Sequence, residues 1–348
     1  MTDWLRKRSP RILMSLAPGI AKDAFEPLER TFCPDGPKIP LGTRAIFRLV
    51  NGQEPTKVPL HLSDNTDAPG LWDGLFGGYC FYDQVINMRM LTLAEGLHVG
   101  MQWARTYPPY VKGHTLIAIG AALVLQQGVP KIYLIDNSDS KVYTASIQNF
   151  SDCTPGRGKP DAVIAWFEHY VDECVSDRYA IAQLLEHHTI NAIGINRYPL
   201  KGPQYGVAVT RGVRIRSSAL YVPELSSEES SFFSYSMRMT ILEPEDSNSE
   251  SVDTCQLMSR HLVFNEGVKG QPPNIVDGEA VIGKYPILKR GGKEFVYQSC
   301  TKVPARRDAI ASLQGSFKFV PGTIEDAKGA PFDVTIPLIQ FLTPTFIL

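Results

Sequence analysis

The segment Phe233–Ile241, FSYSMRMTI, decides the fold of the C-terminal half of this chain. Apolar side chains occupy every second position from Phe233 to Ile241, and serine, arginine and threonine fill the positions between them. Successive side chains of a β-strand point to opposite faces, so the pattern predicts a strand with one apolar and one polar face. Such a strand needs a second layer of structure to remove its apolar face from water.

The same two-residue period recurs on both sides of this segment. It appears at residues 213–216, 316–319 and 332–336, and runs rich in proline and glycine separate these strands. The pattern gives roughly seven strands in about 140 residues, which is typical of an immunoglobulin or fibronectin type III-like sandwich. The sequence therefore predicts an all-β sandwich over residues 205–348.

The first half of the chain has mixed periodicity, which predicts an α+β domain over residues 1–150. Glycine, proline and charged residues at 151–160 begin a linker and helical segment that is expected to extend over 151–204. The expected helices are 4–16, 22–32, 41–50, 114–127, 164–175 and 181–188, and the expected β segments are 79–82, 88–93, 131–136 and 141–147.

Charge and composition exclude several classes of partner. The net charge of −1 gives no field that would attract nucleic acid or an anionic membrane. The longest apolar run, Leu116–Leu125, is too short to span a bilayer, and the N-terminal residues have no signal-peptide core. The six cysteines have irregular spacing without a CxxC pair, which indicates free thiols in a reducing compartment. We therefore expect a cytoplasmic or nuclear protein.

Signatures of catalysis are missing from the sequence. The seven histidines form no HExxH motif, and GxSxG, P-loop and complete GxGxxG patterns do not occur. Acidic pairs such as Glu228-Glu229 lie in hydrophilic segments, where solvated surface is the better explanation. We expect no catalytic residue, no metal site, no cofactor and no enzymatic activity.

One glycine-containing segment, Asp277–Gly283, falls between two predicted strands. Backbone amides near Gly278, Ala280 and Gly283 would form an anion-binding nest if they converged. The alternative is a bulge or tight turn, which we favour because glycine within a strand pattern more often marks bending. Gly278, Ala280 and Gly283 are therefore the candidate ligand-binding residues.

Aromatic and basic residues supply the candidates for partner binding. Phe232 and Phe233 are adjacent in a predicted strand, so both cannot face the core, and one is expected to be exposed. Arg306 and Arg307 form a basic pair, which is more often solvated surface than a binding site. These four residues are the predicted contacts with a protein partner.

Four runs in the C-terminal half resemble an ApaG domain. The runs are CQLMSRHLVFNEG (255–267), VDGEAVIGKYPILKRGGKEFVYQSC (276–300), LQGSFKFV (313–320) and PFDVTIPLIQFLTPTF (331–346). The resemblance covers about residues 205–346 and implies a fibronectin type III-like sandwich. Bacterial ApaG domains carry a GxGxxG-like loop associated with diphosphate binding, and here Ala280 replaces its middle glycine. A methyl group at that position weakens the case for a diphosphate ligand.

Three runs in the N-terminal half are similar to a SUKH (Smi/Knr) domain. They are FEPLERTF (25–32), IPLGTRAIFRLVNGQ (39–53) and GLWDGLFGGYCFYDQ (70–84). A SUKH domain followed by an ApaG domain is the arrangement of the F-box only protein 3 family. No F-box pattern is visible before Trp4, so docking to the Skp–cullin scaffold is expected only if an F-box lies upstream.

This resemblance implies a non-enzymatic protein-recognition module that selects substrates for ubiquitin ligation. Two alternatives remain open. The first alternative is that the chain is a scaffold subunit of a larger assembly. The second is that its ApaG domain binds a small anionic, diphosphate-like ligand.

Overall fold

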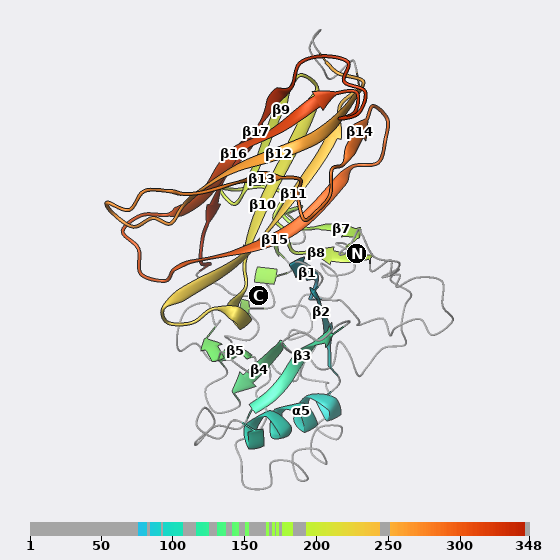
Figure 1. Ribbon diagram of the computed structural model, residues 1–348. Coiled ribbons are helices and arrows are strands. Elements are labelled where there is room, and N and C mark those ends of the chain that lie inside the picture. The colour runs from blue at the N-terminus through green and yellow to red at the C-terminus, as the bar shows by residue number, and fades with distance from the viewer. Residues whose placement is uncertain are drawn as a thin grey trace, which may run out of the picture. The chain divides into compact units, whose positions relative to one another are not determined.

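The computed structural model describes residues 76–81, 84–91, 93–106, 116–124, 131–136, 141–145, 150–152, 165–166, 169–170, 172–173, 176–183, 193–243 and 251–344. The helices expected over 4–16, 22–32 and 41–50 lie outside the described residues. The chain forms two compact units (Figure 1). The N-terminal unit lies within residues 1–197 and also contains 223–225, and the sandwich comprises 198–222 and 226–343. The domain boundaries expected after residues 150 and 204 stay predictions.

The N-terminal unit contains an eight-stranded sheet in the order β6-β5-β4-β3-β2-β1-β8-β7 among its described residues. Neighbouring strands are antiparallel except β1 and β8, which are parallel. The predicted hairpin is confirmed, because β4 pairs with β5. The strands are β1 Gly78–Phe81, β2 Gln84–Met90, β3 Leu116–Val124, β4 Ile132–Asp136, β5 Val142–Ala145, β6 Phe150–Asp152, β7 Ala180–Gln183 and β8 Ile193–Asn196.

The helix expected over 114–127 is wrong, because strand β3 occupies its centre. Consecutive residues from Leu116 to Ile119 are all buried, so both faces of this strand are covered. A strand buried on both faces reads as a continuous apolar run, and periodicity alone does not separate it from a buried helix. The helix was therefore predicted in error because both faces of β3 are buried.

Helix α5, Leu93–Thr106, was not expected from the sequence, which interrupts its apolar pattern with Gly96 and Gly100. Its Trp103 packs in one apolar cluster with Leu116 of β3. Glu95 in the first turn and Arg105 in the last turn complement the helix dipole. Tertiary packing thus stabilises a helix whose sequence propensity is modest.

The helical pair expected over 164–175 and 181–188 is half confirmed. Residues 165–166, 169–170 and 172–173 are helical, and Trp166 and Tyr170 pack around Phe76 with ring centroids 5.5 and 5.8 Å away. The prediction of the second helix, over 181–188, is wrong at 181–183, where β7 pairs with β8.

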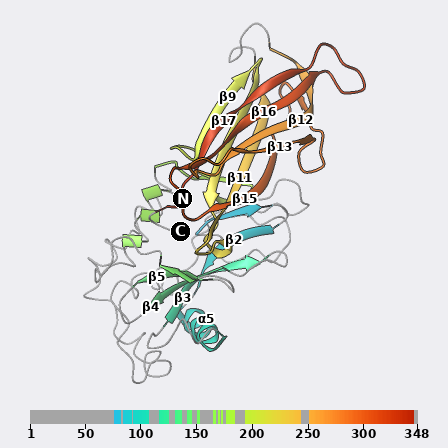
Figure 2. The ribbon, with the colours of Figure 1, turned by 60° about the vertical axis from the view of Figure 1, so that its left-hand side comes forward.

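The sandwich consists of two antiparallel sheets (Figure 2). One sheet has the order β15-β11-β10-β9, and the other has the order β13-β12-β16-β17, with β14 also paired to β12. A 3-10 turn, η3 (Pro223–Leu225), lies between β10 and β11 in the sequence. The strands are β9 Tyr205–Thr210, β10 Val213–Tyr221, β11 Ser230–Ile241, β12 Thr254–Asn265, β13 Asn274–Glu279, β14 Ile287–Lys289, β15 Phe295–Pro304, β16 Ala311–Pro321 and β17 Phe332–Phe341.

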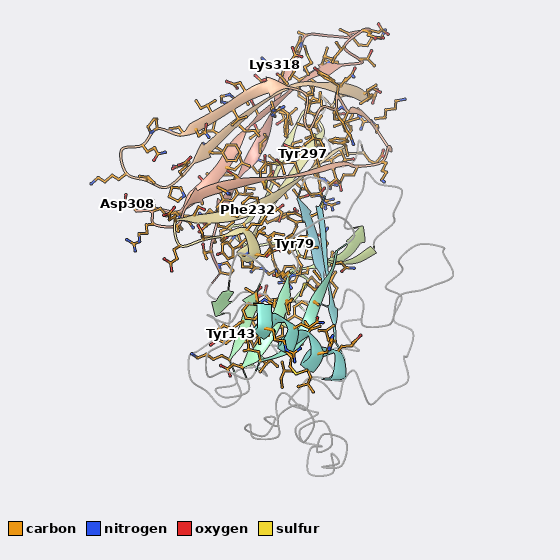
Figure 3. All side chains as sticks on the ribbon, turned by 60° about the horizontal axis from the view of Figure 1, so that its bottom comes forward. Tyr79, Tyr143, Phe232, Tyr297, Asp308 and Lys318 are labelled. Carbon is orange, nitrogen blue, oxygen red and sulfur yellow. The ribbon has the colours of Figure 1, made fainter. Side chains whose placement is uncertain are left out.

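One hydrophobic core lies between the two sheets. The five apolar positions of the segment Phe233–Ile241 are all at most 5% exposed and belong to this core. Phe233 of one sheet meets Phe341 of the other with ring centroids 5.2 Å apart. Tyr297 also belongs to the core, whereas Lys318 lies on the outer surface (Figure 3). The predicted all-β sandwich is therefore confirmed, while its closer assignment to the fibronectin type III type stays a prediction.

Candidate ligand-binding site

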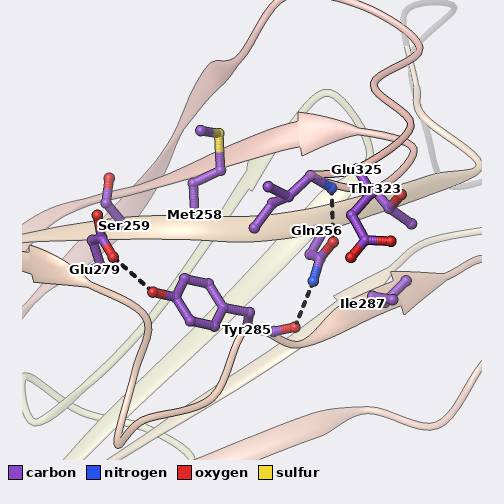
Figure 4. A pocket seen from close by; sticks show the side chains of 9 residues that line it. Gln256, Met258, Ser259, Glu279, Tyr285, Ile287, Thr323 and Glu325 are labelled. Carbon is purple, nitrogen blue, oxygen red and sulfur yellow. Dashed lines mark hydrogen bonds between the residues drawn. The ribbon is translucent and has the colours of Figure 1, made fainter.

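A pocket of about 730 Å³ lies on the outer face of the sheet that contains β12 (Figure 4). Three separate segments of the sandwich form it: strand β12, the stretch from the last residue of β13 to the first residue of β14, and the loop after β16. The lining residues are Gln256, Met258, Ser259, Glu279, Tyr285, Ile287, Thr323, Ile324 and Glu325. We call these nine residues the acidic pocket.

A bulge in β12 places two consecutive residues in the pocket. Opposite β16, the strand register shifts between Leu257 and Ser259, so Met258 is the extra residue. In a regular strand, neighbouring side chains point to opposite faces, whereas a bulge redirects one of them. Met258 and Ser259 therefore both line the acidic pocket.

The carboxamide of Gln256 joins the two loops that border the pocket. Its Nε2 donates to the carbonyl oxygen of Tyr285 at 3.1 Å, and its Oε1 accepts from the amide of Ile324 at 2.8 Å. One side chain on β12 thus holds a backbone group on each side of the strand (Figure 4). Gln256 positions the two loops relative to each other.

Replacing Gln256 with alanine should loosen both loops without unfolding the sandwich. Each lost hydrogen bond contributes about 0.5–1.5 kcal/mol, which is small beside the stability of a domain of this size. The amide of Ile324 should exchange with deuterium at least about fivefold faster, because its acceptor is gone. Hydrogen exchange measured by mass spectrometry checks this, and an unchanged rate at Ile324 with normal folding would contradict the role given to Gln256.

The charged lining of the pocket is entirely acidic. Glu279 and Glu325 contribute carboxylates, and the lining includes no lysine, arginine or histidine. The Tyr285 hydroxyl donates to Oε2 of Glu279 at 2.8 Å, and this hydrogen bond raises the pKa of Tyr285. The phenol therefore remains a neutral donor, and the site presents negative charge beside an aromatic ring.

The segment Gly278–Gly283 leads from the end of β13 into a tight turn, Val281–Lys284, at the edge of this pocket. Val281 and Lys284 exchange two backbone hydrogen bonds, of 3.0 and 2.8 Å, around a two-residue loop. Ile282 and Gly283 both have positive φ, 44° and 72°, as a type I′ hairpin turn requires. The structure thus has the tight turn that we favoured over the anion nest.

Other groups of this segment are already paired. The Ala280 amide donates to the Met258 carbonyl at 3.0 Å, and Nη1 of Arg260 donates to the carbonyls of Glu279 and Ala280 at 2.8 and 2.6 Å. These pairs hold the backbone of the segment against β12. Anion binding by Gly278, Ala280 and Gly283 stays a prediction.

Comparison with known proteins gives a match to part of the C-terminal half and others to the whole chain. The ApaG domain family model matches residues 223–321. F-box protein SKIP16 of Arabidopsis thaliana is 30% identical over 365 residues, which cover 100% of this chain and 78% of that protein. This chain belongs to the family of F-box protein SKIP16.

Two further relatives agree with this SKIP16 family membership. F-box only protein 3 of Homo sapiens is 25% identical over 99% of this chain and 64% of its own length. Protein ApaG of Anaeromyxobacter dehalogenans (strain 2CP-C) is 29% identical over 37% of this chain and 94% of its own length. The chain thus spans less than two thirds of F-box only protein 3. The resemblance to ApaG and to F-box proteins is confirmed, and the SUKH resemblance stays a prediction.

The aromatic residues proposed as partner contacts are not exposed. Phe233 is 0% exposed in the core of the sandwich, and Phe232 is 8% exposed. The expectation that one of the two rings is exposed is therefore not met. Strand alternation explains the inward position of Phe233 but does not predict what covers its neighbour.

The two arginines proposed as partner contacts have different surroundings. Arg306 is exposed. Arg307 donates to the backbone carbonyls of Pro304 and Phe341 at 3.2 and 3.1 Å, and burial lowers its pKa. Arg307 thus ties the end of β15 to the end of β17. Partner binding by Arg306 stays a prediction.

Sequence reasoning missed most of the acidic pocket in this member of the SKIP16 family. Only Glu279 lies inside the candidate ligand-binding segment Asp277–Gly283, and Gln256, Tyr285 and Glu325 were not among the candidate site residues. Among the described residues, no group of three or more His, Cys, Asp or Glu side chains is placed to hold a metal ion. Among those residues there is also no helix that is both long and apolar enough to cross a membrane.

Proposed function

We propose that this chain recognises protein substrates for ubiquitin ligation by binding them, without catalysing a reaction itself. The observation that carries the proposal is the match of the whole chain to F-box protein SKIP16. An F-box protein pairs one segment that docks on a ligase scaffold with another that binds a substrate. The ApaG sandwich, with a pocket on its outer face, suits the second role.

The resemblance to a SUKH domain adds a second candidate binding surface in the N-terminal unit. We place the protein in the cytoplasm or nucleus, where ubiquitin ligation occurs and where the free thiols of Cys80, Cys255 and Cys300 persist. Burial raises the pKa of Cys255 to about 12, so this thiol is unreactive in the folded state.

Capture of bound proteins while cullin activity is inhibited tests the proposal. The full chain, expressed in cells of its source, should bind at least one protein that carries ubiquitin when inhibition is released. The abundance of that protein should rise at least about twofold when the chain is depleted, because slower degradation raises the steady-state level. Ubiquitin-remnant mass spectrometry and quantitative immunoblotting measure the two effects.

A scaffold subunit would behave differently in the same experiment. Its bound proteins would keep their abundance and their ubiquitin state after depletion, and that result would sink the ligase assignment. Recovery of a Skp-type adaptor with the chain supports the ligase assignment, whereas recovery of stable assembly partners alone favours a scaffold.

A further inference from the structure

We propose that the acidic pocket binds an extended peptide segment of the protein partner that carries a lysine or arginine next to an apolar side chain. The inference rests on the proposed function for one point, that the occupant is part of a protein. Its chemistry follows from the pocket itself.

The pocket is large enough for several side chains. Its volume of about 730 Å³ falls in the range of roughly 300–1,000 Å³ that ligand pockets occupy. Three parts of the sandwich line it, and Gln256 fixes two of them by hydrogen bonds. The site is therefore largely formed before a ligand arrives, which lowers the entropic cost of binding.

The charge of the lining selects a cation. Glu279 and Glu325 are the charged residues of the lining, and both carry carboxyl groups. An ammonium or guanidinium group would complement them, and charge-assisted hydrogen bonds to carboxylates are stronger than neutral ones. The Tyr285 ring adds a face on which such a cation can rest. A phosphate or other anion would be repelled by the same residues.

The apolar lining selects a neighbouring hydrophobic group. Three large apolar residues of the lining are well exposed: Tyr285 by 41%, Ile287 by 46% and Ile324 by 44%. Exposed apolar residues that gather in one place usually mark a surface that contacts a partner. The acidic and apolar groups of the lining lie in the same pocket (Figure 4). A peptide supplies a cation and an apolar side chain on one backbone, whereas a small amine supplies only the first.

Calorimetry with the full chain and defined peptides tests the proposal. The first probe is an unlabelled, acetylated and amidated nine-residue peptide in which single serines separate alternating lysine and leucine residues, so that lysine and leucine lie on one face of the extended chain. We expect it to bind with a Kd in the range of about 10–500 µM. A peptide with glutamate in place of lysine should give no heat, and one with serine in place of leucine should bind about fivefold more weakly. Butylamine, the small-amine probe, should give no heat at millimolar concentration.

Two matched double variants separate the pocket from general attraction to an acidic surface. Glu279→Gln with Glu325→Gln removes the pocket charges, while the Tyr285 hydroxyl keeps an oxygen acceptor. Glu228→Gln with Glu229→Gln removes the same charge from two exposed residues outside the pocket. The first pair should raise the Kd of the lysine peptide about tenfold, and the second less than about twofold. Unchanged melting temperatures would confirm that both variants are folded.

Several outcomes would overturn the proposal. Equal weakening in the two double variants, no binding of the lysine peptide, or competition by pyrophosphate would each do so. Tight binding of butylamine would reassign the pocket to a small ligand. If the pocket variant still captures the ubiquitylated partner, this inference fails and the proposed function stands. If the pocket binds the lysine peptide but no partner is ubiquitylated, the peptide-binding inference stands and the proposed function fails.

Discussion

Replacing Gly315 with alanine should destabilise the sandwich by at least about 3 kcal/mol, a loss reached only through backbone strain or severe crowding. Gly315 lies in β16, where it pairs with Leu262 of β12 and Ile336 of β17. Its φ of 151° lies in a region that other residues rarely adopt. A Cβ atom here would lie 2.0 Å from the carbonyl oxygen of His261, so the backbone of one strand must move.

Gly283→Ala is the control for this prediction. Gly283 also has positive φ, but a Cβ atom there would meet nothing within 4 Å. Its loss should be limited to the local strain of about 1–2 kcal/mol. Urea denaturation followed by circular dichroism, with hydrogen exchange of the β12 and β16 amides, measures both variants. Equal losses would show that contact with His261 is not the cause.

Replacing Lys131 with methionine should destabilise the N-terminal unit by about 3–5 kcal/mol, because it leaves a buried carboxylate without its cation. Lys131 and Glu224 are each 1% exposed, and Lys131 Nζ lies 3.5 Å from Glu224 Oε2. Glu224 lies in η3, which belongs to this unit. The Tyr79 hydroxyl donates to Glu224 Oε1, and Lys131 also donates to that hydroxyl at 3.3 Å.

Tyr79 cannot take over the role of the cation. Burial, followed by the charge of Glu224, raises the pKa of Tyr79 well above its ordinary value, so it remains a neutral donor. Combining Lys131→Met with Glu224→Gln should restore at least about half of the lost stability, because no unpaired charge is then buried.

Tryptophan fluorescence during urea denaturation measures this pair of variants. The four tryptophans, Trp4, Trp72, Trp103 and Trp166, all precede residue 198, so the signal reports on the N-terminal unit. A double variant no more stable than Lys131→Met alone would contradict the role of the ion pair.

The fold was predictable where burial is one-sided. In Phe233–Ile241 the polarity of the side chain alternates with the pleat, so the sequence displays the strand and its core face directly. In β3 both faces are buried, the alternation disappears, and a helix was expected in error. Helix α5 was missed for a related reason, since packing against β3 supplies the stability that its glycine-containing sequence lacks.

The acidic pocket was not predictable in the same way. Glu279 and Tyr285 lie close together in the chain, but Gln256 and Glu325 are brought to them only by strand pairing and by the loop after β16. The bulge at Met258 further depends on register with β16 and leaves no mark in the local sequence. Motif searches fail for such a site because its residues share no fixed spacing.

The amino-acid sequence alone determined the two-sheet sandwich and the kinship with ApaG and F-box proteins, because alternation and ordered sequence runs are local properties of a chain. Only the tertiary structure decided which side chains meet. It buried Phe233 in the core and left Phe232 only 8% exposed, closed Val281–Lys284 into a hairpin turn, and joined a carboxylate at the end of β13 with one from the loop after β16 in one pocket. Contacts between residues distant in sequence depend on register and packing, which emerge only when the whole chain folds.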